Sequence, residues 1–135
     1  MQSQGYQKLF EYHNADCFDV KVPSIGPAQA IYYDVAALNQ CVKYIRQHNI
    51  QHPIVYILAC RIGPFAAHFQ KVIHKLGGKL YINPDGHEWM RAKWSAPVRK
   101  YWKISEQLMT KHCDLLICDS KNIEKYIHDE YGKYN

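Results

Sequence analysis

Hydrophobic residues along this chain form unbroken runs and, between these runs, stripes with helical spacing. The longest unbroken run covers residues 54–60. Because such a run is typical of a parallel strand that is covered on both faces, it is predicted to be the central strand of a sheet. Shorter runs of the same kind predict strands at residues 79–83 and 114–118, and weaker patterns predict further strands at 17–22 and 8–12.

Four stretches repeat apolar residues at steps of three and four, which is the spacing of one helix face. Typical start and stop residues mark their ends: Gly26 and Asn49 for the first, Gly63 and Gly77 for the second, Ser95 for the third and Ser120 for the fourth. Strands that alternate with helices of this length build a parallel sheet with right-handed crossovers. The predicted fold class is therefore α/β, a Rossmann-like parallel sheet with flanking helices.

The length of 135 residues suits a single domain, and a chain of this size can bury a core without disulfides or metal. Hydrophobic residues make up 47% and charged residues 21%, which are ordinary proportions for a soluble globular protein. The five cysteines are odd in number and lack the spacing of a zinc site, so we expect buried thiols in a reducing cytoplasm. We find no signal peptide and no apolar segment long enough to span a bilayer, which favours a cytoplasmic location, at most peripheral to the inner face of the membrane.

The net charge of +5 is concentrated in residues 91–112, where six basic residues stand against Glu106 alone. The basic residues are Arg91, Lys93, Arg99, Lys100, Lys103 and Lys111. No recognisable nucleic-acid-binding fold or repeat accompanies them, so no nucleic-acid partner is expected. The last four lie largely opposite the apolar stripe of their helix, which predicts an exposed basic face. Through Arg99, Lys100 and Lys103 this face is expected to contact an anionic membrane weakly.

Ligands of open parallel sheets bind outside the carboxyl ends of the strands, where loops and helix N-termini meet. This rule selects three segments, residues 61–64, 83–95 and 119–120. The middle segment is unusual because it packs acids, bases, a histidine and two tryptophans between a strand and a helix. A structural role also remains open, since residues 84–86 make a good turn and the tryptophans could anchor the loop on the sheet.

The same loop resembles part of a known family. Its sequence Asn-Pro-Asp-Gly-His-Glu-Trp-Met-Arg-Ala-Lys-Trp, followed by residues 95–101 and 114–123, resembles bacterial rhamnosyltransferases for capsule and exopolysaccharide. Residues 25–27 and 59–64 take part in the resemblance, which runs through most of the chain. It implies the N-terminal, acceptor-side Rossmann-like domain of a GT-B, family 4-like glycosyltransferase, in which two such domains face each other.

The chain departs from this family's pattern at both ends. No first strand with a glycine-rich loop precedes Tyr6, and the donor-binding C-terminal domain with its paired glutamates is absent. We therefore expect residues 1–135 to be a single, truncated acceptor-side domain. As an internal fragment, it is expected to be inactive by itself.

The resemblance implies transfer of L-rhamnose from dTDP-L-rhamnose to a lipid-linked saccharide, with retention and without a cofactor. No metal on an Asp-x-Asp pair is implied, and the chain has no such pair. Because the loop after this strand meets both substrates in related enzymes, Asp85, His87 and Glu88 become candidate catalytic residues for hydrogen bonding or proton transfer. The candidate substrate-binding residues are Arg61, Gly63, Asn83, Gly86, Arg91, Lys93 and Ser120. For the two arginines, contact with phosphate and a surface ion pair both remain open, and for His87 so does a purely structural place in the loop.

A freestanding Rossmann-like module that binds a nucleotide or a partner without catalysis is the alternative function. The lack of a Gly-x-Gly-x-x-Gly turn counts against it, because the usual phosphate cradle is missing. A hydrolase is disfavoured by the lack of a Gly-x-Ser-x-Gly turn. A truncated sheet would expose an edge strand, and this edge would allow the chain to pair with a second copy as a homo-oligomer.

Overall fold

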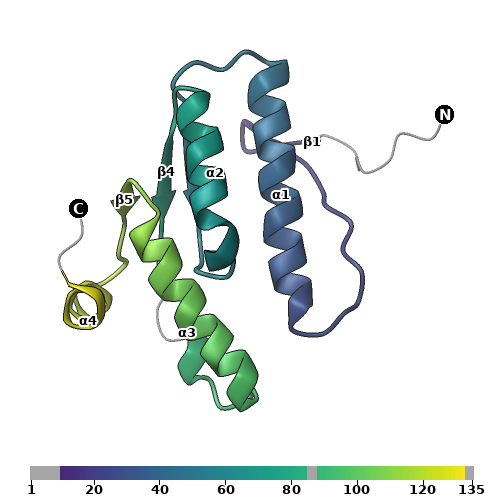
Figure 1. Ribbon diagram of the computed structural model, residues 1–135. Coiled ribbons are helices and arrows are strands. Elements are labelled where there is room, and N and C mark those ends of the chain that lie inside the picture. Colours follow the sequence, from purple (N-terminus) through teal and green to yellow (C-terminus); the bar gives the residue numbers. More distant parts are fainter. Residues whose placement is uncertain (1–9, 85–87, 133–135) are drawn as a thin grey trace.

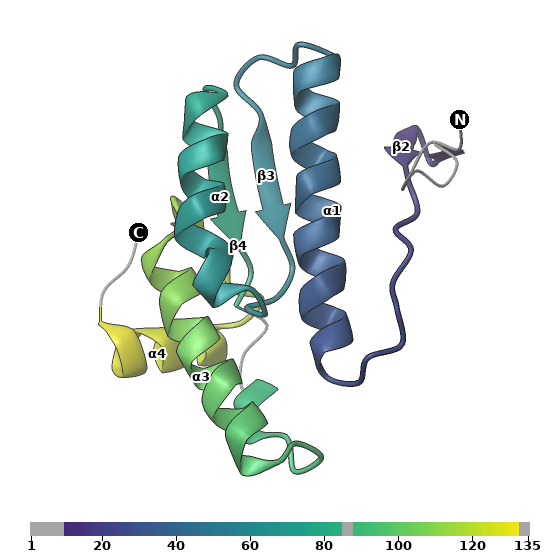
Figure 2. The same ribbon diagram turned by 45° about the vertical axis from the view of Figure 1, so that its right-hand side comes forward.

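The computed structural model describes residues 10–84 and 88–132 (Figures 1 and 2). Helices and strands alternate over most of this range, as the sequence pattern predicts. The elements are β1 (Phe10–Tyr12), β2 (Ala15–Cys17), α1 (Ala28–Gln47), β3 (Ile54–Ile57), α2 (Gly63–Lys75), β4 (Lys79–Ile82), the 3-10 helix η1 (Glu88–Met90), α3 (Ala96–Lys111), β5 (Leu115–Leu116) and α4 (Lys121–Tyr131).

The main sheet is parallel, with the strand order β3-β4-β5. Ile54 pairs with Lys79 at the start of the β3–β4 register, and Ile82 pairs with Leu116 where β4 meets β5. Helices α2 and α3 connect these strands in turn and pack against each other. Figure 2 shows α2 in front of β4, with β3 between α2 and α1 in this view. This arrangement confirms the predicted α/β class with a Rossmann-like parallel sheet.

The strand at residues 54–60 is shorter than predicted and does not occupy the centre. Strand β3 ends at Ile57 and lies at one edge of the described sheet, whereas β4 is the middle strand. The prediction that both of its faces are covered is also wrong: Ile54 and Tyr56 are 62% and 43% exposed, whereas Val55 between them is buried. The reason is that α1, α2 and α3 all pack on the face that carries Val55.

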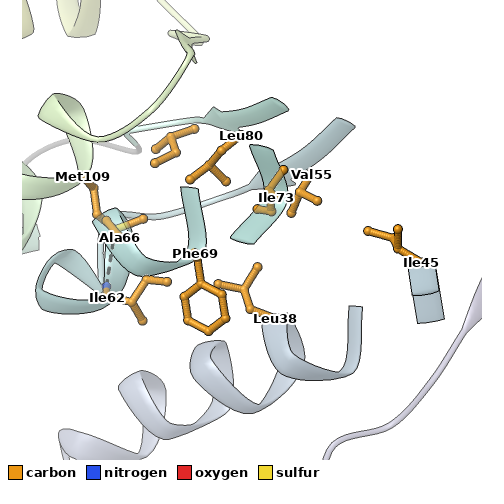
Figure 3. Close-up of a cluster of buried hydrophobic side chains, with 10 residues drawn as sticks. Leu38, Ile45, Val55, Ile62, Ala66, Phe69, Ile73, Leu80 and Met109 are labelled. Atoms are coloured by element: carbon orange, nitrogen blue, oxygen red, sulfur yellow. Dashed lines mark hydrogen bonds between the residues drawn. The ribbon is translucent and has the colours of Figure 1, made fainter. Parts of the chain in front are cut away.

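That covered face holds the core. Figure 3 shows Val55 and Leu80 of the strands among side chains from α1 and α2, with Met109 of α3 at one end. Buried members of this cluster are Leu38, Ile45, Val55, Ile62, Ala66, Phe69, Ile73, Leu80, Ile82 and Met109. The five cysteines are all free and each is only partly buried, so the expectation of fully buried thiols was too strong. Burial nevertheless raises the pKa of Cys113 to about 11, which makes this thiol a poor nucleophile at neutral pH.

The N-terminal part of the described chain forms a hairpin instead of further strands of the main sheet. Strands β1 and β2 pair antiparallel around His13 and Asn14, which both have positive φ, as a tight two-residue hairpin turn requires. The strand predicted at residues 8–12 is thus confirmed over Phe10–Tyr12, although in a separate sheet. The strand predicted at residues 17–22 is wrong, because the chain leaves β2 at Cys17 and runs on without regular structure to α1.

All four predicted helices are present, and Gly63 explains how two of them pack. Its N–H donates to Ser105 Oγ of α3 at 2.7 Å, and the same hydroxyl donates to the carbonyl oxygen of Cys60 at 2.7 Å. A Cβ on Gly63 would lie 2.4 Å from Ser105 Cα, well inside contact distance. The absence of a side chain at Gly63 therefore lets α2 begin directly against the backbone of α3.

The carboxylate of Asp114 joins the start of β5 to its neighbours. It accepts a hydrogen bond from the Leu80 N–H at 2.7 Å and lies 2.8 Å from His74 Nε2 of α2. Burial alone would raise the pKa of Asp114, but the Leu80 N–H and the His74 imidazole outweigh it and hold this pKa below its usual range. Strand β5 is thus fixed to β4 and α2 by one side chain.

Candidate functional site

A pocket of about 330 Å³ opens where the chain leaves the carboxyl ends of β3 and β4. Its walls come from the segment after β3, the segment after β4 and helix α3, with one residue from α1. The lining residues are Ala30, Ala59, Cys60, Arg61, Pro84, Arg91, Lys93, Trp94, Trp102 and Glu106. The structure thus brings together two of the three segments that the sequence selects, at the end of the sheet where ligands of such folds bind.

Arg61 forms one side of this pocket and is held by an ion pair. Its Nε and Nη2 donate to the two carboxylate oxygens of Asp34 at 2.7 and 2.8 Å, and Asp34 is almost completely buried in α1. The backbone carbonyl of Arg61 accepts the Tyr101 hydroxyl at 2.8 Å. The ion pair that the sequence left open for Arg61 is therefore present. The two hydrogen bonds to Asp34 fix the orientation of the guanidinium at the edge of the pocket.

Basic and aromatic side chains form the opposite wall. Arg91 and Lys93 are exposed, and Lys93 Nζ lies 4.5 Å from the centre of the Trp94 ring. The Trp94 ring meets that of Trp102 edge to face, at 5.8 Å between ring centres. Cations beside a partly exposed Trp94 ring suit a ligand that combines a phosphate with a sugar, because a flat ring packs on the apolar C–H faces of the sugar.

Glu106 lines the same pocket as a buried carboxylate, only 3% exposed. Its Oε1 accepts the hydroxyls of Tyr126 and Tyr131, both at 2.5 Å. The Tyr126 oxygen in turn accepts the indole N–H of Trp89 at 2.9 Å. Burial, together with the nearby Glu106, raises the pKa of both tyrosines. These bonds connect α3, α4 and η1, so Trp89 anchors its loop on α4 and not on the sheet.

Lys103 departs from the predicted basic face. Its Nζ donates to Glu130 Oε2 at 2.8 Å and lies 4.5 Å from the centre of the Trp89 ring and 4.9 Å from that of Tyr131. Lys103 is therefore only partly exposed, because Glu130 and these rings hold the cation between α3 and α4, and its contact with a membrane remains a prediction. Arg99, Lys100 and Lys111 are exposed as predicted.

Three of the candidate binding residues have structural contacts away from the pocket. Gly63 is buried at the α2–α3 contact, as described above. Asn83 is buried, and its amide donates to Asp119 Oδ1 at 2.8 Å. Ser120 caps α4 by accepting the Ile123 N–H at 3.3 Å. None of the three lines the pocket, and their roles in substrate binding remain predictions.

The candidate catalytic residues fall largely outside the described part of the chain. Asp85 and His87, with Gly86 between them, lie outside the described residues. Glu88 begins η1, but its side chain is not described either. The structure does fix the two ends of this loop, because Pro84 and Arg91 both line the pocket.

Sequence reasoning missed Glu106 and Trp102 as site residues. Both belong to the buried side of α3, whose buried residues are Trp102, Ser105, Glu106, Met109 and Thr110. Positions 102, 105, 106 and 109 have the spacing of one helix face. A glutamate at a stripe position of an amphipathic helix was therefore the signal that could have revealed a buried, hydrogen-bonded carboxylate.

Within residues 10–84 and 88–132, no group of three or more side chains is arranged to hold a metal ion. The helices in these ranges are also too short or too polar to cross a membrane.

Comparison with known proteins gives a family. The family profile described as "Domain of unknown function (DUF1972)" matches residues 1–135. This domain is associated with glycosyltransferase-like proteins. No curated protein and no solved structure matches the chain. Because the profile extends over all 135 residues, the chain belongs to the DUF1972 family.

Proposed function

We propose that this chain is the acceptor-side part of a GT-B glycosyltransferase of bacterial polysaccharide synthesis. It would take part in the transfer of L-rhamnose from dTDP-L-rhamnose to a lipid-linked saccharide. The proposal combines the resemblance of the loop sequence to rhamnosyltransferases with the association of the DUF1972 domain with glycosyltransferase-like proteins.

The observation that carries the proposal is the pocket at the carboxyl ends of β3 and β4. Arg91 and Lys93 supply positive charge for a phosphate or diphosphate, beside the Arg61–Asp34 ion pair. Trp94 supplies an aromatic face for a sugar ring. Both substrates of the proposed reaction consist of a sugar joined to a diphosphate, so the chemistry of the pocket suits either one.

The loop between Pro84 and Arg91 is proposed to supply the reacting groups. Asp85, His87 and Glu88 stand in the sequence between two residues that line the pocket. A carboxylate or imidazole there would accept the proton of the acceptor hydroxyl or hold a hydroxyl of the donor sugar. Gly86 would leave the backbone open to close approach by a ligand.

The proposed function is tested by a transfer assay with dTDP-L-rhamnose and a lipid-linked acceptor. We expect transfer by the complete gene product that contains this chain, and none by the 135-residue chain alone. Holding donor and acceptor in one geometry supplies several kcal/mol of barrier lowering, and an acceptor-side domain provides only part of that geometry. Rhamnose transfer by the chain alone would contradict the acceptor-side assignment. Binding of the donor without transfer by the complete product would favour the non-catalytic module instead.

The exposed part of the basic face is proposed to contact anionic lipid. Arg99, Lys100 and Lys111 are exposed, and each is worth on the order of 1 kcal/mol near an anionic surface. We expect salt-sensitive sedimentation with anionic vesicles, and weaker binding for Lys100→Glu. The matched control is Lys71→Glu, the same change of charge at an exposed position of α2. Equal binding of the wild type to neutral and anionic vesicles would contradict the electrostatic contact.

A further inference from the structure

Two side chains that line the pocket, Glu106 and Trp102, each have a polar atom with no hydrogen-bond partner within the described residues. Glu106 Oε1 receives both tyrosine hydroxyls, whereas no hydrogen bond to Glu106 Oε2 is found within the described residues. The indole N–H of Trp102 is the other, since this side chain is buried and its Nε1 has no hydrogen-bond partner in the described part of the chain. Both residues line the pocket.

An unpartnered buried polar group is costly, by about 1 to 3 kcal/mol, and is uncommon in native proteins. Within the described residues this cost falls on the Trp102 N–H, whereas Glu106 Oε2 is not a buried atom without a partner. Glu106 and Trp102 follow each other by one helical turn on α3 and therefore lie on the same side of the helix. Together they offer one acceptor and one donor to whatever occupies the pocket.

We infer that Glu106 and Trp102 form the sugar-binding end of this pocket, with Glu106 Oε2 accepting a hydrogen bond from a sugar hydroxyl and Trp102 Nε1 donating to a sugar oxygen. Hydroxyl groups both donate and accept, so the hydroxyls of a sugar would satisfy both members of such a pair. The carboxylate also discriminates: it repels a phosphate and directs it toward the basic side chains of the opposite wall, Arg91 and Lys93. The ligand is thus a phosphorylated sugar in a fixed orientation.

The size of the pocket fits this ligand. At about 30 Å³ for each water, 330 Å³ has room for roughly eleven water molecules. That space can hold the sugar phosphate part of either substrate. The inference deepens the proposed function and rests on it for the choice between the two possible sources of the ligand, the lipid-linked acceptor and the nucleotide-sugar donor.

The tyrosine hydroxyls hold the Glu106 carboxylate in place for this contact. Because Tyr126 and Tyr131 both donate to Oε1, the carboxylate is held in one orientation, and its second oxygen is left for the ligand.

Glu130 is a suitable control residue for Glu106. It pairs with Lys103 but does not line the pocket.

The test is a titration with glucose 1-phosphate and, separately, with inorganic phosphate, followed by the tryptophan fluorescence of the pocket. For the wild-type chain we expect at least about tenfold tighter binding of the sugar phosphate, because a hydrogen bond to a charged group is worth roughly a factor of ten or more in affinity. Glu106→Gln should remove most of this difference and should not weaken phosphate binding, because it removes a negative charge from the pocket. Glu130→Gln, the matched control, should preserve both affinities.

Trp102→Phe gives a second variant in case Glu106→Gln folds poorly, which a thermal melt would reveal. The N–H that it removes has no partner within the described protein, so the variant should also lose the preference for the sugar phosphate. Equal binding of glucose 1-phosphate and inorganic phosphate by the wild type would overturn the inference. It would also be overturned if Glu106→Gln weakened both ligands equally, since Glu106 would then act only on the structure.

Competition experiments separate the two sources of the ligand. If the pocket takes the sugar phosphate of the acceptor, a short-chain prenyl diphosphate sugar should displace glucose 1-phosphate and dTDP should not. Displacement by dTDP would assign the pocket to the donor. The binding test and the transfer assay can fail separately. Binding of the sugar phosphate without rhamnose transfer by the complete gene product would refute only the proposed function. Transfer without such binding would refute only the sugar-binding role of Glu106 and Trp102.

Discussion

Gly63→Ala is expected to destabilise the domain by about 3 kcal/mol, at the upper end of the usual cost of overpacking a core. The new methyl carbon would lie 2.4 Å from Ser105 Cα and 2.5 Å from the Ser105 carbonyl oxygen. These are backbone atoms of α3, so no change of side-chain rotamer can relieve the contact. Separating the helices would also stretch the bonds that Ser105 makes to Gly63 and Cys60.

The measurement is a thermal melt beside the wild type. At roughly 4 °C per kcal/mol for a domain of this size, the midpoint should fall by about 10 °C or more. Gly26→Ala is the matched control, because its added carbon meets no atom within 4 Å. That variant should cost only the strain of a positive φ, on the order of 1 kcal/mol. Equal midpoints for the two variants would contradict the close α2–α3 contact.

Asp85→Asn in the complete gene product is expected to lower turnover by about a hundredfold, close to 3 kcal/mol, with little effect on folding. The change keeps the shape of the side chain and removes its charge. Asp85 follows the middle strand of the sheet by three residues, between Pro84 and Arg91 of the pocket wall. A carboxylate in this loop is therefore expected to act on the substrates.

Steady-state kinetics and a thermal melt on the same protein distinguish this prediction from a turn-forming role. Asparagine serves in turns almost as well as aspartate, so a structural Asp85 would leave turnover unchanged and alter only stability. Asp129→Asn is a suitable control: it removes the same charge from the exposed surface of α4, where Asp129 pairs with Lys125. Unchanged turnover for Asp85→Asn would remove this loop from the proposed catalytic machinery.

The sequence predicted the helices better than the strands. Helix ends depend on local chemistry, and Gly77, with its positive φ, ends α2 where the pattern places the stop. Strand order depends on pairing between distant segments, which hydrophobicity does not reveal. The run at residues 54–60 therefore seemed central, although β4 holds that position. Val55 of this run packs in the core, whereas its neighbours Ile54 and Tyr56 lie on the face that the helices do not cover.

Contacts between distant segments also limit what the sequence predicts about the site. The composition of the loop predicts a site in residues 83–95, and the structure places Arg91, Lys93 and Trp94 around a pocket. Glu106 was overlooked because a charged residue in a helix is normally read as exposed. Its burial depends on Tyr126 and Tyr131, which approach from another helix. Lys103 was misjudged for the same reason, because Glu130 and the surrounding rings come from outside its own helix.

Because helices cover only one face of the sheet, neighbouring residues of β3 differ in how they tolerate a polar substitution. Ile54, Tyr56 and Leu58 all carry more than a third of their surface to solvent, whereas Val55 is buried. Polar substitutions at the three exposed positions remove an apolar surface that promotes aggregation, and surface changes usually alter stability by less than about 0.5 kcal/mol. The same substitution at Val55 would place an unpaired polar group in the core. Polar residues at Ile54, Tyr56 and Leu58 can therefore improve solubility with almost no loss in the free energy of unfolding.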